Sequence, residues 1–182
     1  MLEKKIIIAG FGGQGVLFMG KLIAHAAMVA GKELSWLPSY GPEMRGGTAN
    51  CHVVISEEPV ASPIIVNPDV LISLNKPALD KFEDAVAEGG TILVDKTLVD
   101  RKVKRNDVKI KYIEATKVAA ELGNAALSNM VMLGAFLKET GIFVLDELKD
   151  SITKNIPKAK QALAEIDIKA LTAGYNLVPC EG

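Results

Sequence analysis

Residues that commonly bind metals and clusters are scarce in this sequence. Its 182 residues include two cysteines, Cys51 and Cys180, and two histidines, His25 and His52. Two cysteines so far apart build neither a disulfide framework nor the cysteine motifs of zinc and iron–sulfur sites. We therefore expect no metal ligands on this chain. The low cysteine content is typical of a protein of the reducing cytoplasm, and we expect a cytoplasmic location.

An excess of charge of either sign is also absent. The sequence has 21 Lys and Arg residues against 22 Asp and Glu residues, so the formal net charge is -1. A near-neutral chain lacks the overall basic field of a dedicated nucleic-acid-binding protein. Two apolar stretches, residues 6–9 and 122–137, are too short or too interrupted by glycine to span a membrane. We expect no nucleic-acid partner and no membrane association.

What is present is the pattern of an α/β protein. Apolar residues make up 49% of the chain and charged residues 24%, which suits a soluble domain, and we expect residues 1–182 to form one domain. β-branched runs predict strands at residues 5–9, 33–37, 48–56, 60–66, 69–74, 91–95 and 111–115. Helical periodicity predicts helices at residues 13–30, 77–88, 116–122, 125–140, 145–155 and 158–171, followed by a tail from Tyr175. This alternation predicts a three-layer α/β domain with a mostly parallel, Rossmann-like sheet flanked by helices.

The most informative motif is a glycine-rich segment between the first strand and the first helix. It runs Gly10-Phe11-Gly12-Gly13-Gln14-Gly15 and matches Gly-x-Gly-x-x-Gly. In dinucleotide-binding proteins these glycines allow a tight turn, the close approach of an anion and close packing of the helix on the sheet. Free N–H groups at the start of the helix would attract a phosphate.

The rest of the dinucleotide fingerprint is missing. An acidic residue that binds the ribose should end the second strand, but that strand ends in Leu37-Pro38-Ser39-Tyr40. Glu33 lies at the opposite end of the strand, and no P-loop motif occurs. Three interpretations of the glycine motif stay open: an NAD or FAD site, a site for another anionic or nucleotide-like ligand, and a tight turn that packs against a neighbouring subunit.

A second segment rich in glycine and proline is expected at the same edge of the sheet. It reads Ser39-Tyr40-Gly41-Pro42-Glu43-Met44-Arg45-Gly46-Gly47-Thr48 and follows a predicted strand. Ligand sites of α/β proteins lie at this edge, so the segment is a candidate binding or docking loop. The alternative is a surface turn with a local ion pair between Glu43 and Arg45.

Isolated polar residues provide no catalytic constellation. His25 is interpreted as a packed helical residue, and Cys51 and His52 point to opposite faces of a strand. The basic run from Arg101 to Arg105 predicts a solvated loop, with RNA or an acidic partner as alternatives. Asn129, in an apolar helix, is either a core amide or an interface contact.

The two loops together resemble the gamma subunits of 2-oxoacid:ferredoxin oxidoreductases, most of all that of the 2-oxoglutarate enzyme. The segments Asp69–Asn75 and Asn129–Gly134 resemble this family too, and the similarity covers about residues 3 to 172. It implies a subunit of a complex that oxidatively decarboxylates a 2-oxoacid to an acyl-CoA and reduces ferredoxin. A stand-alone Rossmann-like nucleotide-binding module is the alternative.

The resemblance also implies where the cofactors of such a complex belong. Thiamine diphosphate would lie on partner alpha and beta subunits, and iron–sulfur clusters on partners that include a ferredoxin-like delta subunit, with ferredoxin as electron acceptor. This chain has no thiamine motif of the Gly-Asp-Gly…Asn type, so we expect it to bind none of these cofactors tightly. We expect the isolated chain to be inactive, and a homodimer stays open for it.

The resemblance further implies which residues contact coenzyme A or the thiamine-binding subunits. They are Gly12, Gly13, Gln14 and Gly15 in the first loop, and Tyr40, Gly41, Glu43, Arg45, Gly46 and Gly47 in the second. The planar guanidinium of Arg45 suits an anionic ligand or a partner carboxylate. The resemblance gives no residue a catalytic role.

Overall fold

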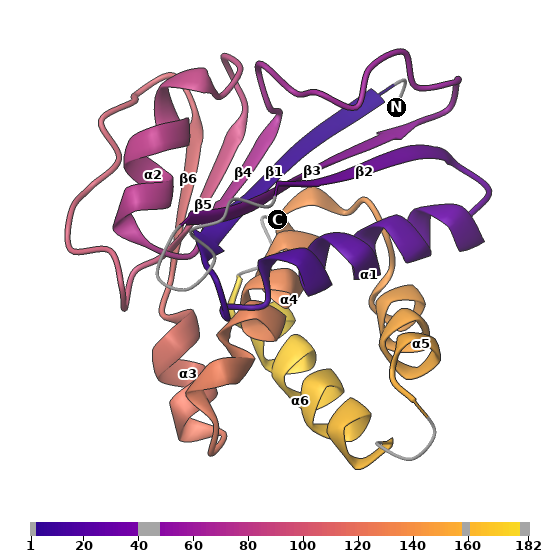
Figure 1. Cartoon of the computed structure of the whole chain (residues 1–182). Helices are drawn as coiled ribbons and strands as arrows, with labels where there is room; N and C mark the ends of the chain where they lie inside the picture. Colours follow the sequence, from indigo (N-terminus) through magenta and orange to yellow (C-terminus); the bar gives the residue numbers. More distant parts are fainter. Residues whose placement is uncertain (1–2, 40–47, 158–160, 179–182) are drawn as a thin grey trace.

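Strands and helices alternate along the computed structural model, which describes residues 3–39, 48–157 and 161–178 (Figure 1). The strands are β1 (Glu3–Phe11), β2 (Glu33–Ser39), β3 (Thr48–Ser56), β4 (Val70–Ser73), β5 (Thr91–Asp95) and β6 (Lys109–Ile113). The helices are α1 (Val16–Val29), α2 (Lys76–Phe82), α3 (Ala115–Glu121), α4 (Ser128–Thr140), α5 (Leu145–Asn155) and α6 (Gln161–Leu177). Two single 3-10 turns, η1 (Glu83–Ala85) and η2 (Ala125–Leu127), complete the order.

A single sheet joins the described strands in the order β2-β3-β1-β4-β5-β6. The pairs β1–β4, β4–β5 and β5–β6 are parallel, whereas β3 runs antiparallel to both β1 and β2. All described strands except β3 therefore point the same way. The prediction of a mostly parallel sheet is confirmed.

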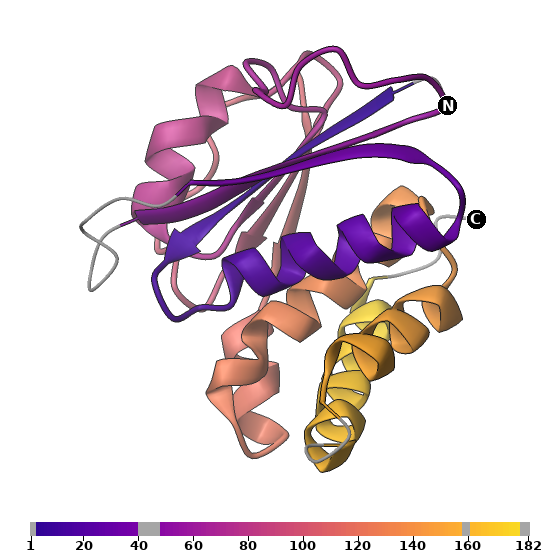
Figure 2. The ribbon, with the colours of Figure 1, turned by 45° about the vertical axis from the view of Figure 1, so that its right-hand side comes forward.

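Helices cover both faces of this sheet and make three layers (Figures 1 and 2). α2 lies on one face, and α1 with α3, α4, α5 and α6 lies on the other. β1 shows why both faces are covered, because its side chains alternate between two apolar cores. Ile6 and Ile8 enter the larger core under α1 and α4, and Ile7 and Ala9 enter the smaller core under α2. The predicted three-layer α/β fold is confirmed.

The strand predicted at residues 60–66 is wrong. This segment belongs to the loop between β3 and β4, and both edges of β3 are already paired, with β1 and β2. Pro59 and Pro63 lack the N–H groups that a paired strand needs. Ile65 alone is buried in the smaller core, and its N–H donates to His52 Nδ1 at 3.0 Å.

The tail predicted from Tyr175 is also wrong in its first residues, because α6 continues to Leu177. α4 and α6 cross so closely that glycine is needed on both helices. A Cβ atom on Gly174 would lie 1.8 Å from the carbonyl oxygen of Val131, and one on Gly134 would lie 2.0 Å from that of Leu171. The crossing at Gly174 holds the last turns of α6 in the packed layer.

Other helix boundaries differ from the predictions by a few residues. α1 begins at Val16, after the glycine loop, and the helix expected at residues 77–88 ends at Phe82 before η1. The helix expected at residues 125–140 is divided into η2 and α4. None of these differences changes the order of elements or the edge at which the loops lie.

Candidate functional site

The glycine loop, residues 12–15, lies at the carboxyl end of β1 and leads into α1. After β1 the chain winds towards β2 on one side of the sheet, and after β3 it crosses to β4 on the other side of β1. The loop after β1 and the segment after β4 therefore meet where the winding direction changes. This is the place at which open α/β sheets bind ligands. The predicted position of the loop is confirmed.

The Gln14 side chain ties this loop to its neighbours. Its Oε1 accepts hydrogen bonds from the Phe11 N–H at 2.6 Å and from Asn75 Nδ2 at 3.1 Å. Its Nε2 donates to the Leu74 carbonyl at 3.3 Å. Both hydrogen-bonding atoms of the side chain are thus used within the chain, and Gln14 shapes the loop rather than extending from it.

Asn75 is a residue of this site that the sequence analysis did not single out. It caps α2, since its Oδ1 accepts from the Ala78 N–H at 2.9 Å, while its Nδ2 reaches Gln14. An asparagine directly before a helix that has Pro77 in its first turn is a recognisable N-cap signal. Its contact with Gln14, 61 positions away in the sequence, carries no local signal.

Two glycines of the loop adopt backbone angles that favour glycine. The φ angles are +93° at Gly13 and +73° at Gly15. A Cβ atom on Gly15 would lie 2.1 Å from Asn129 Nδ2, whereas one on Gly13 would meet nothing within 4 Å. Gly15 is therefore needed for close packing of α1 on α4, and Gly13 is open to a ligand or partner. Asn129 is 7% exposed and its Oδ1 accepts from the Met130 N–H at 2.9 Å, which supports its interpretation as a core amide.

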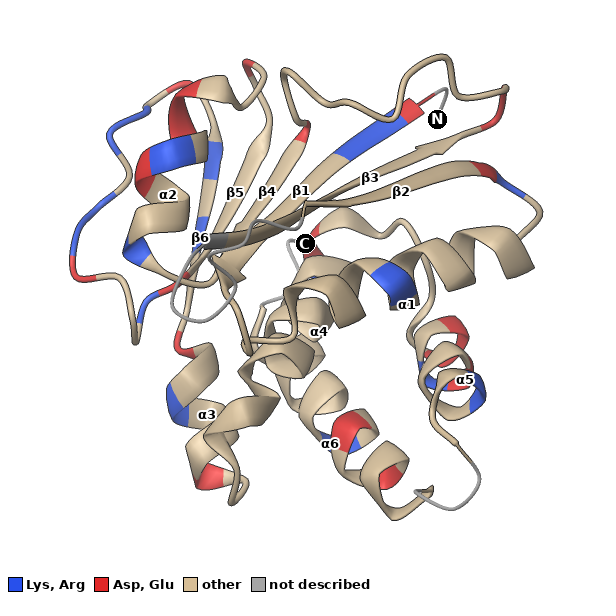
Figure 3. Cartoon of the chain, viewed as in Figure 1, with Lys and Arg blue, Asp and Glu red and all other residues tan. Residues whose placement is uncertain are grey.

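A hollow of about 250 Å³ borders the start of α1. It is lined by Phe11, Gly12, Gly13, Gly15, Val16, Leu17, Phe18 and Ala49. No described side chain caps α1 and no acidic residue lies in its first turn, so within the described residues its first N–H groups have no side-chain capping partner. Figure 3 shows no charged residue on this first turn. An uncapped helix start beside apolar side chains suits an anionic group attached to an apolar body.

The second predicted loop falls outside the described residues. It lies within residues 40–47 and contains the candidates Tyr40, Gly41, Glu43, Arg45, Gly46 and Gly47. Its flanks are described: Thr48 pairs with Phe11, next to the glycine loop, and Ser39 pairs with Asn50. Both flanks therefore lie at the same edge of the sheet as the glycine loop, as the sequence predicts.

The isolated cysteine and histidine candidates have structural partners. Burial raises the pKa of the Cys51 thiol to about 12, and its Sγ donates weakly to the Val16 carbonyl at 3.6 Å, so a reactive thiolate is absent at neutral pH. Burial, helped by Lys81, lowers the pKa of His52 from its ordinary value and keeps Nδ1 free to accept from Ile65. His25 Nδ1 lies 3.0 Å from Ser151 Oγ, between α1 and α5.

The basic run Arg101 to Arg105 is a loop, as predicted, but its arginines are not free in solvent. The Arg101 guanidinium binds both carboxylate oxygens of Glu83 and also Asp80. The Arg105 guanidinium donates to Asp107 and to three backbone carbonyls at the end of η1. These arginines hold the β5–β6 connection against α2, which argues against RNA recognition by them.

Within residues 3–39, 48–157 and 161–178, no group of three or more His, Cys, Asp or Glu residues could hold a metal ion. In the same part of the chain, no helix has the length and apolar character needed to cross a bilayer. The described residues thus form a hollow with glycine-rich backbone at the switch point of the sheet, and none of those that line it has a charged or nucleophilic side chain.

Comparison with known proteins identifies the family. A family model described as pyruvate ferredoxin/flavodoxin oxidoreductase matches residues 5–177. This chain belongs to that family. Among solved structures, the gamma subunit of a keto/oxoacid ferredoxin oxidoreductase from Geobacter sulfurreducens is similar, with a TM-score of 0.81 and 30% identity over 95% of this chain and 96% of that one. The resemblance to gamma subunits is confirmed.

Relatives in the pyruvate ferredoxin/flavodoxin oxidoreductase family differ in length and in name. The 2-oxoglutarate synthase subunit KorC of Methanocaldococcus jannaschii is 37% identical over 97% of this chain and 94% of its own length. The ketoisovalerate oxidoreductase subunit VorA of Methanothermobacter thermautotrophicus is 44% identical, but this chain spans only 36% of it. A structure of 2-oxoglutarate:ferredoxin oxidoreductase from Magnetococcus marinus, with 2-oxoglutarate, coenzyme A and succinyl-CoA bound, matches with a TM-score of 0.88 and 25% identity, and this chain covers 31% of that one.

Proposed function

We propose that residues 1–182 form the gamma-subunit domain of a cytoplasmic 2-oxoacid:ferredoxin oxidoreductase. The complex would oxidatively decarboxylate a 2-oxoacid, form the acyl-CoA and reduce ferredoxin. The observation that carries the proposal is a match along 94% of the 2-oxoglutarate synthase subunit KorC and 96% of the Geobacter sulfurreducens gamma subunit. A switch-point loop without reactive side chains agrees with an accessory subunit rather than a complete enzyme.

2-Oxoglutarate is the substrate that we propose, because the KorC match covers nearly the whole of both chains. Ketoisovalerate is the second candidate, since VorA is more identical, at 44% against 37%. No described side chain of this chain offers a contact specific to either 2-oxoacid. Partner subunits would therefore select the substrate.

The glycine loop would contact coenzyme A or the thiamine-binding subunits through its backbone. The uncapped start of α1 suits a phosphate group, and the apolar hollow beside it suits an uncharged part of the ligand. Gly12 and Gly13 would allow close approach, while Gln14 and Gly15 would keep the loop in shape. From the second loop we propose Tyr40, Gly41, Glu43, Gly46 and Gly47 as further contacts and Arg45 as the cationic partner.

The cofactors of the reaction would be supplied by partners. We propose alpha and beta subunits that bind thiamine diphosphate, a delta subunit that resembles ferredoxin, and ferredoxin as electron acceptor. Thiamine diphosphate would provide the decarboxylation chemistry and the clusters the electron transfer. This chain's own part would be to exclude water and orient coenzyme A, and alone it would be inactive.

Anaerobic purification of the native complex tests this function. We expect this chain to co-purify with thiamine diphosphate-binding and cysteine-rich chains. The complex should reduce ferredoxin with coenzyme A and one of 2-oxoglutarate, ketoisovalerate or pyruvate, and the best substrate decides between the two candidates. Recovery of the chain alone, with affinity for free NAD or ATP in calorimetry, would instead support a stand-alone nucleotide-binding module.

A further inference from the structure

Two further hollows lie beside β6, the edge strand of the sheet. These hollows of about 270 and 350 Å³ share Lys96 and Tyr112, and we call them together the Lys96 groove. Lys96 directly follows β5, and Tyr112 is the penultimate residue of β6. Each hollow is close to the lower end of the size range of small-molecule sites. The groove shares no lining residue with the hollow at the glycine loop.

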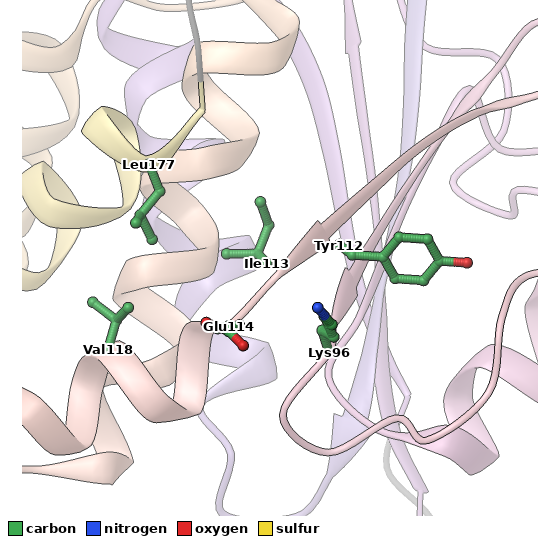
Figure 4. A pocket seen from close by; sticks show the side chains of 6 residues that line it. All are labelled: Lys96, Tyr112, Ile113, Glu114, Val118 and Leu177. Atoms are coloured by element: carbon green, nitrogen blue, oxygen red, sulfur yellow. The ribbon is translucent and has the colours of Figure 1, made fainter.

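One lobe of the groove, which we call the apolar lobe, has three apolar side chains beside Lys96 and Glu114. Ile113, Val118 and Leu177 line it, and Figure 4 shows these three side chains on one side of Lys96. They come from β6, α3 and the last residue of α6. Leu177 remains 44% exposed, so this lobe can bury further apolar surface when it is filled.

The other lobe presents a fixed aromatic ring. In Figure 4 the Tyr112 ring points away from the apolar lobe, and it is 38% exposed. Its hydroxyl accepts a hydrogen bond from the Val103 N–H at 2.8 Å, which holds the ring against the β5–β6 connection. Val99, which is buried, contributes to the same lobe. A flat aromatic ligand could stack on a ring held in this way with little loss of entropy.

The unpaired charge in the groove is positive. Asp100 pairs with Lys76 at 3.2 Å, and Glu114 pairs with Lys117 at 3.1 Å. Arg101, which also lines the groove, is engaged by Glu83 and Asp80 as described above.

Two cations are left over. Among the described residues, neither Lys96 nor Lys102 has an ion-pair or hydrogen-bond partner for its Nζ atom. The pKa of Glu114 is lowered mainly by Lys117, and Lys96 adds a smaller contribution. An anionic group in the hollow that both lysines line would be favoured, because an ammonium group can donate a charge-assisted hydrogen bond to it.

We propose that the Lys96 groove binds a small aromatic anion. Its phosphate or carboxylate would lie at Lys96 and Lys102, its ring on Tyr112, and any apolar extension in the lobe of Ile113, Val118 and Leu177. This ligand site is separate from the coenzyme A side proposed above and does not depend on it. Its distance along the sheet from the glycine loop, across β4 and β5, suits an effector or a second small molecule rather than the reacting one.

Nuclear magnetic resonance of the ¹⁵N-labelled full chain tests this site. The probes are AMP, which carries a phosphate, and indole-3-acetate, which carries a carboxylate, with adenosine and inorganic phosphate as incomplete ligands. We expect one or both aromatic anions to shift the amide signals of Lys96, Tyr112 and Ile113, and the incomplete ligands to bind at least about tenfold more weakly. The better probe identifies the anionic group.

Charge variants complete the test. Lys96→Met removes an exposed charge without a packing partner, so the chain should stay folded, and we expect about tenfold weaker binding. Lys149→Met is the matched control on α5, where Lys149 pairs with Asp146, and it should bind as the wild type does. Absence of localised shifts up to about 10 mM probe, shifts at Gly12 and Gly13 alone, or unchanged binding by Lys96→Met would each overturn the proposal.

Discussion

The glycine loop and the β5–β6 connection both begin at the carboxyl edge of the sheet, and the connection then crosses α2 to the opposite edge, where β6 begins. The two segments are held by different kinds of contact. The glycine loop is fixed by neutral groups: the amide of Gln14 and the close approach of Gly15 to Asn129. The β5–β6 connection is fixed by charged groups, above all Arg101 on Glu83, whose side chain is 2% exposed. Figure 3 shows the same contrast, with charged residues gathered around α2 and β6 and few on α1 and α4.

This difference bears on function. A loop whose side chains satisfy one another with neutral hydrogen bonds leaves the partial positive charge of its helix start uncompensated. The β5–β6 connection uses its arginines for its own structure, and only Lys96 and Lys102 stay available. Under the two proposals, the glycine loop would bind an anion through backbone N–H groups, and the β5–β6 connection would do so through the side chains of Lys96 and Lys102.

The largest effect is expected for Gly15→Ala, which tests the close packing of Gly15 against Asn129. The new Cβ would collide with Asn129 and would also require a left-handed backbone in a non-glycine residue. We expect a loss of about 3–5 kcal/mol in the free energy of unfolding, measured by urea denaturation. The matched control is Gly13→Ala, which has a similar φ angle but open space, and it should cost only about 1–2 kcal/mol. Equal losses would contradict the packing role of Gly15.

Charge in the β5–β6 connection is tested by Arg101→Met. The change leaves the buried Glu83 carboxylate with only the Lys104 N–H and the distant Lys104 ammonium as partners. We expect a loss of about 2–3 kcal/mol in the free energy of unfolding, measured by urea denaturation, because a buried carboxylate is left without its guanidinium partner. Lys102→Met in the same loop should cost less than about 0.5 kcal/mol. Equal losses for the two variants would contradict the structural role of the Arg101–Glu83 pair.

The smallest expected effect is that of Gln14→Ala. Three hydrogen bonds are lost, but the freed Phe11 N–H is close to solvent, so we expect a cost of about 1–2 kcal/mol. Gln14→Glu keeps the acceptor for Phe11 and Asn75 and loses the donor to Leu74. We expect its loss in the free energy of unfolding to be about half of the loss caused by Gln14→Ala. If both variants unfold as the wild type does, the amide does not hold the loop.

The fold and the position of the glycine loop could be predicted from the sequence. Runs such as Ile6-Ile7-Ile8 fit only a strand buried on both faces, and the glycine motif fits only a strand-to-helix turn. The error at residues 60–66 came from β-branched residues that three nearby prolines keep out of a sheet. Apolar spacing alone gave no sign that α6 would continue past Gly174, because that depends on the contact with Val131.

Contacts over long sequence separations could not be predicted. Gln14 was expected to face a ligand or a subunit, and its bonds to Leu74 and Asn75 lie 60 and 61 positions away. The Lys96 groove unites residues from three separate segments. The basic run from Arg101 was singled out in the sequence, but nothing in it indicated contact with Tyr112 or Leu177. Backbone placement at the sheet edge was predictable from the order of elements, and side-chain partners were not.

The central claim, that the glycine loop faces coenzyme A or the thiamine-binding subunits, is tested most directly by Gly13→Asp in the assembled complex. Gly89→Asp is the control, because Gly89 also has a positive φ and open space but lies before β5, at the opposite edge. We predict that Gly13→Asp raises the KM for coenzyme A at least about tenfold or prevents assembly, since it places a carboxylate beside the anion site. Gly89→Asp should assemble and turn over normally. Identical behaviour of the two variants in assembly and in KM would contradict the account.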